Sequence, residues 1–289
     1  MPTATATRPV AVIGAGTMGS GIAQVFAAAG RQVYLGDRDE PSLKRGLASI
    51  AKSLDRLIKK GTLDAAARDQ VLARIRGATA GLPLSECAIA VEAVPERLDL
   101  KKVVLRELDN ALPPDAILAT NTSSISITEL AAVTGRAARV IGMHFMNPVP
   151  VMPLVEVVRG LETSEETVTR TMELARDLGK TPVLVEDRPG FVSNRVLLPM
   201  INEAIFALQE GVATREGIDT VMKLGMNHPL GPLALADLIG LDVCLDIMEV
   251  LHRGFGDDKY RPCPLLRQMV AAGRLGRKSG RGFYDYSDS

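Results

Sequence analysis

Short apolar runs alternate with longer amphipathic segments through the first two thirds of the chain. The apolar runs predict buried strands, because parallel strands covered on both faces read as continuous hydrophobic stretches. They lie at residues 10–13, 33–36, 88–91, 116–119, 140–143, 154–158 and 182–185. The segments between them repeat apolar residues every three or four positions and predict helices at residues 18–29, 41–60, 64–76, 98–111 and 163–178. Strands that alternate with helices in this way predict a doubly wound α/β sheet.

The pattern changes at residues 186–190, beyond which only helical periods follow. These periods predict helices at residues 192–209, 214–224, 241–252 and 265–272. We therefore predict two domains, an α/β domain over residues 1–187 and an all-α domain over residues 188–289. A helical domain with many apolar positions often buries part of its surface against a second subunit. This favours a homodimer that forms through the second domain.

The first apolar run leads into a glycine-rich turn, Gly14-Ala15-Gly16-Thr17-Met18-Gly19, and then into the first helix. A turn of this spacing brings backbone N–H groups and a helix N-terminus to a pyrophosphate. Asp37 follows the second strand, where a carboxylate accepts hydrogen bonds from an adenosine ribose. Strand, turn, helix, strand and acid in this order predict a Rossmann-type dinucleotide-binding domain, with residues 14–19 and Asp37 contacting the cofactor.

The residue after the second strand also bears on the choice between NAD and NADP. Asp37 favours NAD, because its carboxylate would repel the 2′-phosphate of NADP. The neighbouring Arg38 would instead accommodate that phosphate. We predict NAD and leave NADP open.

The composition excludes several other classes of protein. The 289 residues include 34 basic and 34 acidic side chains, so no net charge favours a nucleic acid or an anionic membrane as partner. The spacing of Cys87, Cys244 and Cys263 fits neither a zinc site nor a disulfide framework, and we expect reduced thiols. No apolar run is long enough to span a bilayer, and the N-terminus does not read as a secretory signal. We predict a cytoplasmic protein that binds no metal.

Candidate catalytic side chains follow two neighbouring strands. Ser123 comes after one strand, and His144 follows the next. The carboxyl ends of parallel strands line the ligand crevice, so both side chains should lie at the edge that holds the glycine turn. Glu156 interrupts a later apolar strand, and a buried carboxylate needs a partner such as histidine. Structural explanations stay open for each alone: Ser123 as a turn former, Glu156 as a solvent-facing edge residue.

Six motifs follow one another along the chain. They are Gly14-Ala15-Gly16-Thr17-Met18-Gly19-Ser20-Gly21-Ile22-Ala23-Gln24, Val91-Glu92-Ala93-Val94-Pro95-Glu96, Asn121-Thr122-Ser123-Ser124, His144-Phe145-Met146-Asn147-Pro148, Pro189-Gly190-Phe191-Val192-Ser193-Asn194-Arg195 and Gly280-Arg281-Gly282-Phe283-Tyr284. In this order they resemble the 3-hydroxyacyl-CoA dehydrogenase family, and the bacterial 3-hydroxybutyryl-CoA dehydrogenases in particular. The resemblance covers essentially the whole chain.

The resemblance implies catalytic roles for four residues. His144 would be the general acid/base at the 3-oxygen of the substrate, and Glu156 would hold and polarise it. Ser123 and Asn194 would hydrogen-bond the reacting oxygen or orient His144 and the substrate. Asn194 also has a structural explanation as a helix cap.

The resemblance further implies two sets of binding residues. The set for the nicotinamide half of the cofactor comprises Glu96, Lys101, Ser123, Asn147 and Lys278. For the charged members, an ordinary surface ion pair is the alternative explanation. Ser53 and Lys60 would meet the CoA part of an acyl-CoA substrate, and Ser123 the reacting end. A solvated helix face is the alternative for Ser53 and Lys60.

These observations predict an NAD-dependent enzyme of fatty-acid metabolism. It would oxidise short-chain (S)-3-hydroxyacyl-CoA to 3-ketoacyl-CoA, as in 3-hydroxybutyryl-CoA to acetoacetyl-CoA, and catalyse the reverse. Stereochemistry and chain length come from the resemblance. Two alternatives stay open: a related sugar-acid or hydroxy-acid dehydrogenase, and a non-catalytic NAD-binding structural protein.

Overall fold

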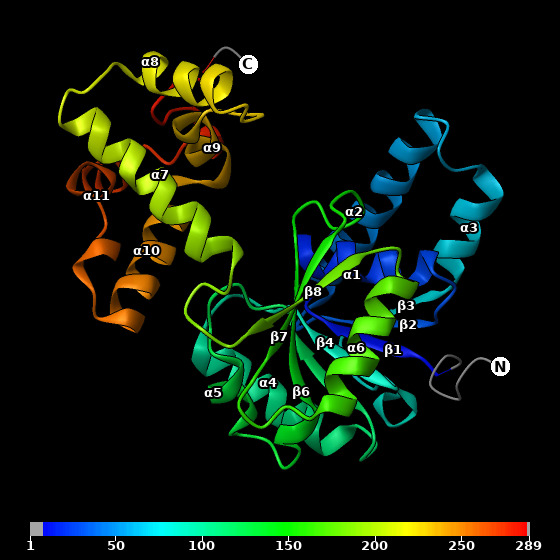
Figure 1. The fold of residues 1–289 in the computed structure, drawn as a ribbon. Helices are drawn as coiled ribbons and strands as arrows, with labels where there is room; N and C mark the ends of the chain where they lie inside the picture. The colour runs from blue at the N-terminus through cyan, green and yellow to red at the C-terminus, as the bar shows by residue number, and fades with distance from the viewer. Residues whose placement is uncertain (1–7, 288–289) are drawn as a thin grey trace. The chain divides into compact units, whose positions relative to one another are not determined.

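The computed structural model describes residues 8–287, and its strands form one sheet in the first of two compact units (Figure 1). The sheet has eight strands in the order β3-β2-β1-β4-β5-β6-β7-β8. The strands are β1 (Val10–Ile13), β2 (Val33–Gly36), β3 (Ile75–Ala78), β4 (Ile89–Glu92), β5 (Ile117–Thr120), β6 (Val140–Phe145), β7 (Leu154–Arg159) and β8 (Thr181–Glu186). β1 to β6 are parallel, β7 is antiparallel to β6, and β8 is parallel to β7.

The direction in which successive strands are added to the sheet changes at β1. From β1 the chain builds outward to β2 and β3, and then returns to place β4 against the other edge of β1. Ligands of open α/β sheets bind outside the carboxyl ends of the strands at such a reversal. The sheet therefore directs attention to the turns that follow β1 and β4.

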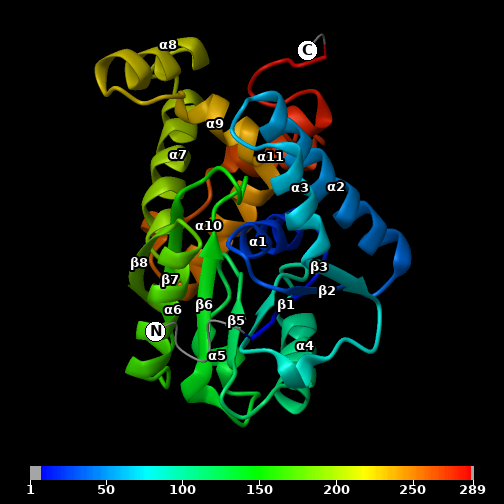
Figure 2. The same ribbon diagram turned by 90° about the vertical axis from the view of Figure 1, so that its right-hand side faces the viewer.

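Helices flank both faces of this sheet, which makes the first unit a Rossmann-type fold. They are α1 (Thr17–Ala28), α2 (Glu40–Lys59), α3 (Ala65–Ala73), α4 (Leu98–Ala111), α5 (Ile127–Ala131) and α6 (Glu165–Asp177), with short 3₁₀ turns at Leu84–Glu86 and Ala137–Arg139. Residues of α1, α2 and α6 share one core cluster with the sheet, whereas α4 contacts α5. α2 and α3 form a helical pair that projects beyond the sheet (Figures 1 and 2).

Local signals explain where these helices begin. The side chains of Asp39, Asp64, Ser126 and Ser164 each accept a hydrogen bond from a backbone N–H in the first turn of the helix that follows. Gly61, at φ 70°, follows the end of α2. Because these signals depend on neighbouring residues alone, the helices lie close to their predicted positions.

Two features of the sheet differ from the prediction. The predicted helix 64–76 ends at Ala73, and Ile75–Ala78 pairs with β2 as an edge strand. This strand includes Arg76 and Gly77, so it lacks the apolar run of a buried strand. The antiparallel direction of β7 was not predicted either, because an apolar run carries no information about direction.

The second compact unit begins at Arg188 and is helical, as predicted for the C-terminal part of the chain. Its elements are α7 (Ser193–Gln209), α8 (Arg215–Thr220), a π-helical turn (Val221–Gly225), α9 (Pro232–Ile239), α10 (Leu241–Phe255), α11 (Pro264–Ala271) and 3₁₀ turns at Asp258–Tyr260 and Arg277–Ser279. They pack around their own apolar core. α9 was not predicted, because it is a short and mostly apolar helix whose sequence shows little helical alternation of apolar and polar residues.

One of the six motifs proves to be a structural device of this unit. The buried Asp237 accepts hydrogen bonds from the backbone N–H groups of Phe283 and Tyr284, at 2.9 Å each. A Cβ at Gly282 would lie 1.9 Å from the same carboxylate. Burial raises the pKa of Asp237. The C-terminal segment is thus fastened to α9 by a buried carboxylate.

Candidate active site

The glycine turn joins β1 to α1, and its three glycines meet different surroundings. Gly14 has φ 104°, and a Cβ there would lie 2.5 Å from the carbonyl oxygen of Ala93. A Cβ at Gly19 would lie 1.7 Å from the carbonyl oxygen of Gly14. Within residues 8–287, no atom outside the turn comes within 4 Å of a Cβ placed at Gly16. Packing therefore requires glycine at Gly14 and Gly19, whereas Gly16 leaves open space at the N-terminus of α1.

This open position fits the pyrophosphate of a dinucleotide. Gly16 is the N-cap of α1, and in the described chain no side chain caps the helix there. Thr17 and Met18 begin α1, and the first N–H groups of an α-helix have no acceptor within the helix. A dinucleotide would supply acceptor oxygens at this point, so the residues present fit the cofactor.

The different surroundings of Gly16 and Gly19 predict different outcomes for the same substitution. Gly16→Ala should change Tm by less than about 3 °C, because the added methyl group meets open space, yet weaken NADH binding about 10-fold or more by obstructing the phosphates. Gly19→Ala should destabilise the fold by about 3 kcal/mol or more. Thermal unfolding and NADH fluorescence titration measure the two effects. Equal loss of stability in both variants would contradict this assignment.

Asp37 lies directly after β2, where its carboxylate contacts the glycine turn. One oxygen accepts the Ala15 N–H at 2.7 Å, and the other accepts the Arg38 N–H at 2.7 Å. The guanidinium of Arg38 points to Asp39, with Nε 3.0 Å from Oδ2, and its side chain is 88% exposed. The glycine turn and Asp37, the predicted ribose acceptor, are therefore in direct contact.

A third element supports the same turn, and the sequence analysis did not identify it. A Cβ at Gly46, in the middle of α2, would lie 2.5 Å from the carbonyl oxygen of Ala15. Glycine at this position lets α2 pack directly on the turn. A glycine at a buried position of an otherwise amphipathic helix was the available signal.

His144 and Glu156 are paired across β6 and β7. They are register partners in the antiparallel ladder, with Nδ1 of His144 2.8 Å from Oε2 of Glu156. The two residues are 8% and 2% exposed. Directly opposite residues of an antiparallel pair point to the same face, which brings the carboxylate to the ring. This contact fixes the orientation of the imidazole ring through Nδ1.

Ser123 lies in the loop after β5 and is held by Glu96. Oε1 of Glu96 accepts from the Ser123 N–H at 2.8 Å and from Ser123 Oγ at 3.2 Å. Burial by itself would raise the pKa of Glu96, but Lys101 and hydrogen bonds from Thr122 and Ser123 outweigh it, and the pKa lies below its usual value. Glu96 is therefore a carboxylate that shapes the loop.

Lys101 is not placed as an exposed surface ion pair. It is 1% exposed, with its ammonium between the carboxylates of Glu92 and Glu96. Lys101 is connected to the Ser123 loop by its ion pair with Glu96. Glu92, which is 0% exposed, had no predicted role of its own.

The remaining predicted residues lie on other loops and helices of the two units. Asn147 is exposed in the loop after β6. Ser53 is half-buried on α2, and Lys60 is the exposed residue at the C-cap of that helix. Asn194 lies in the first turn of α7, and Lys278 forms an ion pair with Asp242; both belong to the second unit.

Two further residues support the strands and loop around His144. The Asn121 side-chain oxygen accepts the Phe145 N–H at 3.0 Å, which ties the end of β5 to the end of β6. The ammonium of Lys180 donates to the carbonyl oxygens of Val149 and Met152, at 2.6 and 2.8 Å. Burial lowers the pKa of Lys180. The buried ammonium of Lys180 thus holds the loop between β6 and β7 in place. No sequence signal had pointed to this lysine.

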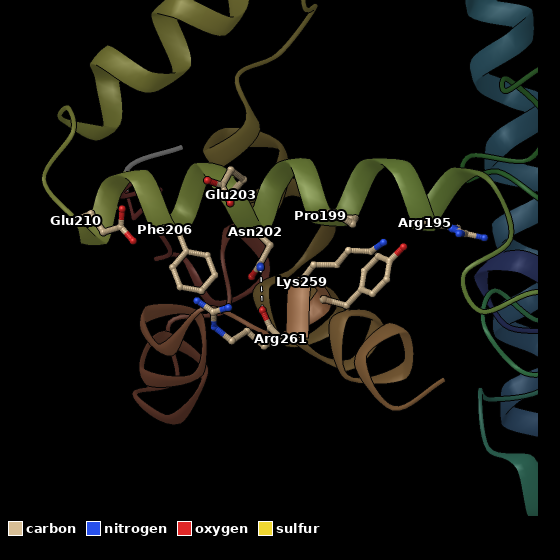
Figure 3. Close-up of a pocket in the computed structure, with 9 residues that line it drawn as sticks. Arg195, Pro199, Asn202, Glu203, Phe206, Glu210, Lys259 and Arg261 are labelled. Carbon is tan, nitrogen blue, oxygen red and sulfur yellow. Dashed lines mark hydrogen bonds between the residues drawn. The ribbon is translucent and has the colours of Figure 1, made fainter. Parts of the chain in front are cut away.

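The second unit carries a separate hollow of about 490 Å³ along α7 (Figure 3). Its lining comprises Arg195, Pro199, Asn202, Glu203, Phe206, Glu210, Lys259, Tyr260 and Arg261. None of the predicted site residues is among them. The Asn202 side chain bridges the hollow by donating to the Arg261 carbonyl oxygen at 3.0 Å.

Over residues 8–287, no three His, Cys, Asp or Glu side chains are grouped so that they could hold a metal ion. No helix in that range combines the length and apolar character needed to cross a membrane. Cys87, Cys244 and Cys263 are buried free thiols. Burial raises the pKa of Cys87 and of Cys244 to about 12.

Comparison with known proteins connects these clusters to a family. Residues 9–188 match the model of the 3-hydroxyacyl-CoA dehydrogenase NAD binding domain, and residues 190–286 match the model of the C-terminal domain of the same family.

Curated relatives and solved structures agree with this match. The chain is 58% identical over 281 residues to the probable 3-hydroxybutyryl-CoA dehydrogenase of Bacillus subtilis (strain 168), which covers 97% of this chain and 98% of the relative. It is 52% identical over 279 residues to the 3-hydroxybutyryl-CoA dehydrogenase of Bradyrhizobium diazoefficiens, covering 96% and 95%. The crystal structure of (S)-3-hydroxybutyryl-CoA dehydrogenase from Ralstonia eutropha gives a TM-score of 0.95 at 55% identity, over 98% of this chain and 100% of that one. The chain therefore belongs to the 3-hydroxyacyl-CoA dehydrogenase family of NAD-dependent oxidoreductases that act on CH–OH groups.

Proposed function

We propose that this protein interconverts short-chain (S)-3-hydroxyacyl-CoA and 3-ketoacyl-CoA, with 3-hydroxybutyryl-CoA and acetoacetyl-CoA as the substrate pair. The observation that carries the proposal is the buried His144–Glu156 pair. It lies near the carboxyl end of β6, and β6 is parallel to β1, whose carboxyl end bears the glycine turn. An acid/base pair at the same edge of the sheet as a dinucleotide site is the arrangement that hydride transfer from an alcohol requires.

The proton transfers are assigned to His144. NAD supplies the acceptor for the hydride that leaves C3 of the hydroxyacyl group. Nε2 of His144 takes the proton of the 3-hydroxyl group as the carbonyl forms. In the direction of reduction, the protonated ring returns a proton to the developing alkoxide. Glu156 keeps Nδ1 protonated throughout and stabilises the imidazolium that forms.

The binding roles follow the clusters described above. Residues 14–19 and Asp37 would hold the adenosine and pyrophosphate, while Glu96 and Ser123 would meet the nicotinamide half. The roles of Asn147, Asn194, Lys278, Ser53 and Lys60 rest on the sequence resemblance and stay predictions. The homodimer and the cytoplasmic location also stay predictions.

Oxidation of NADH, followed by absorbance, tests the proposed reaction. We expect turnover of acetoacetyl-CoA, and a comparison with longer 3-ketoacyl-CoA substrates measures the chain-length preference. No rate above the blank with any of these substrates would refute the proposal. Reduction of NAD by a free hydroxy acid or sugar acid, without turnover of the CoA esters, would support the alternative dehydrogenase.

The contacts of Asp37 and Arg38 predict a preference for NADH over NADPH. Arg38 would have to leave Asp39 before it could accept a 2′-phosphate, and Asp37 would repel that phosphate. We expect kcat/KM to be about 10-fold or more higher with NADH, which corresponds to about 1.4 kcal/mol. In Asp37→Ser the ratio should fall, because the repelling charge is gone. Equal rates with the two cofactors in the unaltered protein would contradict this reading.

A further inference from the structure

Three charged side chains, two of them fully buried, form a cluster at the carboxyl ends of β4 and β5. Glu92 ends β4 and Lys101 lies in α4; they are 0% and 1% exposed. The Lys101 ammonium lies 2.7 Å from Oε1 of Glu92 and 3.3 Å from Oε2 of Glu96. It also donates to the carbonyl oxygen of Val94 at 3.2 Å. An ammonium has three N–H groups, so these three acceptors fix its position.

Glu92 is anchored by the sheet itself. Its Oε1 accepts the Val94 N–H at 2.7 Å, and its Oε2 accepts the Thr120 hydroxyl at 2.6 Å. Charges removed from water are tolerated when they are paired and hydrogen-bonded, and Glu92 meets both conditions. A fully buried carboxylate held in this way is a fixed ion-pair partner for Lys101.

Glu96 links Lys101 to the loop that carries Ser123. Its side chain is 35% exposed, so it connects the buried ammonium to the surface of the site. Its Oε1 accepts from Thr122 Oγ1 at 2.5 Å, from the Ser123 N–H at 2.8 Å and from the Ser124 N–H at 3.1 Å. The loop therefore wraps around one oxygen, while Lys101 faces the other.

We propose that Glu92 is a positioning residue of the site. It fixes the position of the Lys101 ammonium, and that ammonium fixes the carboxylate of Glu96. Glu96 in turn holds residues 122–124 and the hydroxyl of Ser123 in place. Glu92 is buried beneath the loop and acts through Lys101 and Glu96. The effect on turnover rests on the proposed reaction, whereas the effect on NADH binding rests only on the proposed contact of Glu96 and Ser123 with the nicotinamide half.

Three variants separate positioning from a purely structural role. Glu92→Gln keeps the shape and removes the charge beneath Lys101. Lys101→Met removes the ammonium and leaves Glu92 buried without its counter-ion, which should lower Tm most. In the double variant Glu92→Gln/Lys101→Met, both buried charges are gone, so Tm should recover relative to Lys101→Met. Glu96 still lacks its ammonium in the double variant.

A second ion pair on the same helix provides a matched control. Asp109, also in α4, accepts from the Arg136 guanidinium and from the Gly135 N–H, and both charged side chains are mostly buried. It lies toward the other end of α4, close to the residues that precede β5. Asp109→Asn should lower Tm while kcat and the Kd for NADH stay within about twofold of the unaltered protein.

We expect Glu92→Gln and the double variant to lower kcat about 10-fold or more and to weaken NADH binding severalfold, with little change in KM for the acyl-CoA. Recovery of Tm in the double variant without recovery of kcat or NADH affinity would support positioning. Unaltered kcat and NADH affinity in the double variant would overturn the proposal. If the unaltered protein does not reduce acetoacetyl-CoA, the proposed reaction fails, and NADH titration of the same variants still decides the role of Glu92.

Discussion

Replacement of His144 by glutamine should lower kcat for acetoacetyl-CoA reduction about 10³-fold. General acid/base catalysis by a positioned side chain contributes about 10²- to 10⁴-fold, and His144 is the group to which we assign both proton transfers. Glutamine is the sharpest replacement, because its amide can still donate to Glu156 and fill most of the same volume, but cannot exchange a proton at neutral pH. Steady-state kinetics with saturating NADH and acetoacetyl-CoA measure the loss.

The same variant should bind NADH within about twofold of the unaltered protein, since the loss concerns the transition state. The chain offers a matched control in His252 on α10, whose Nε2 lies 3.2 Å from an oxygen of Asp258. His252→Gln makes the same chemical change at a half-exposed site, and its kcat should be unchanged. A rate for His144→Gln within threefold of the unaltered protein would remove His144 from the mechanism.

Glu156→Gln should lower kcat about 10²-fold. The substitution preserves the size of the side chain and leaves an amide oxygen able to accept from Nδ1, but it removes the charge that stabilises the imidazolium. It also permits the amide to present its NH₂ group to the ring, which would favour the other tautomer. The effect should appear in kcat with KM for acetoacetyl-CoA nearly unchanged, because the carboxylate acts during proton transfer.

A double variant shows whether Glu156 acts through His144. If it does, His144→Gln/Glu156→Gln should be no slower than His144→Gln alone, since residues that act as a unit are not additive. Multiplication of the two losses in the double variant would instead assign Glu156 an independent role. Thermal unfolding of each variant separates these effects from a general loss of stability at this buried pair.

The glycine turn illustrates what could be predicted from local sequence. The conformation of Gly14 and the close approach at Gly19 are demanded by the turn itself, so their spacing identified it. The N-cap of α5 is equally local, because the Ser126 side chain accepts a hydrogen bond from the backbone N–H of Glu129, three residues on. Such features depend on residues only a few positions apart, which is why a sequence reveals them.

Features that need distant partners were less accessible. Gly46 reads as an ordinary interruption of a helix until α2 is placed against Ala15. Lys101 reads as an exposed helical lysine, and its burial follows from the placement of Glu92 beneath α4. Lys180 likewise has no local signal for the two loop carbonyl groups to which it donates.

The sequence by itself determined the two-part composition of strands and helices, the dinucleotide turn and the identity of the candidate acid/base residues. Only the tertiary structure decided that β7 runs antiparallel to β6, which sets Glu156 directly opposite His144. The physical reason is that backbone conformation and capping depend on nearest neighbours, whereas strand direction and charge burial depend on packing between segments far apart in the chain. A pair twelve residues apart in sequence thus became a single site through the register of one ladder.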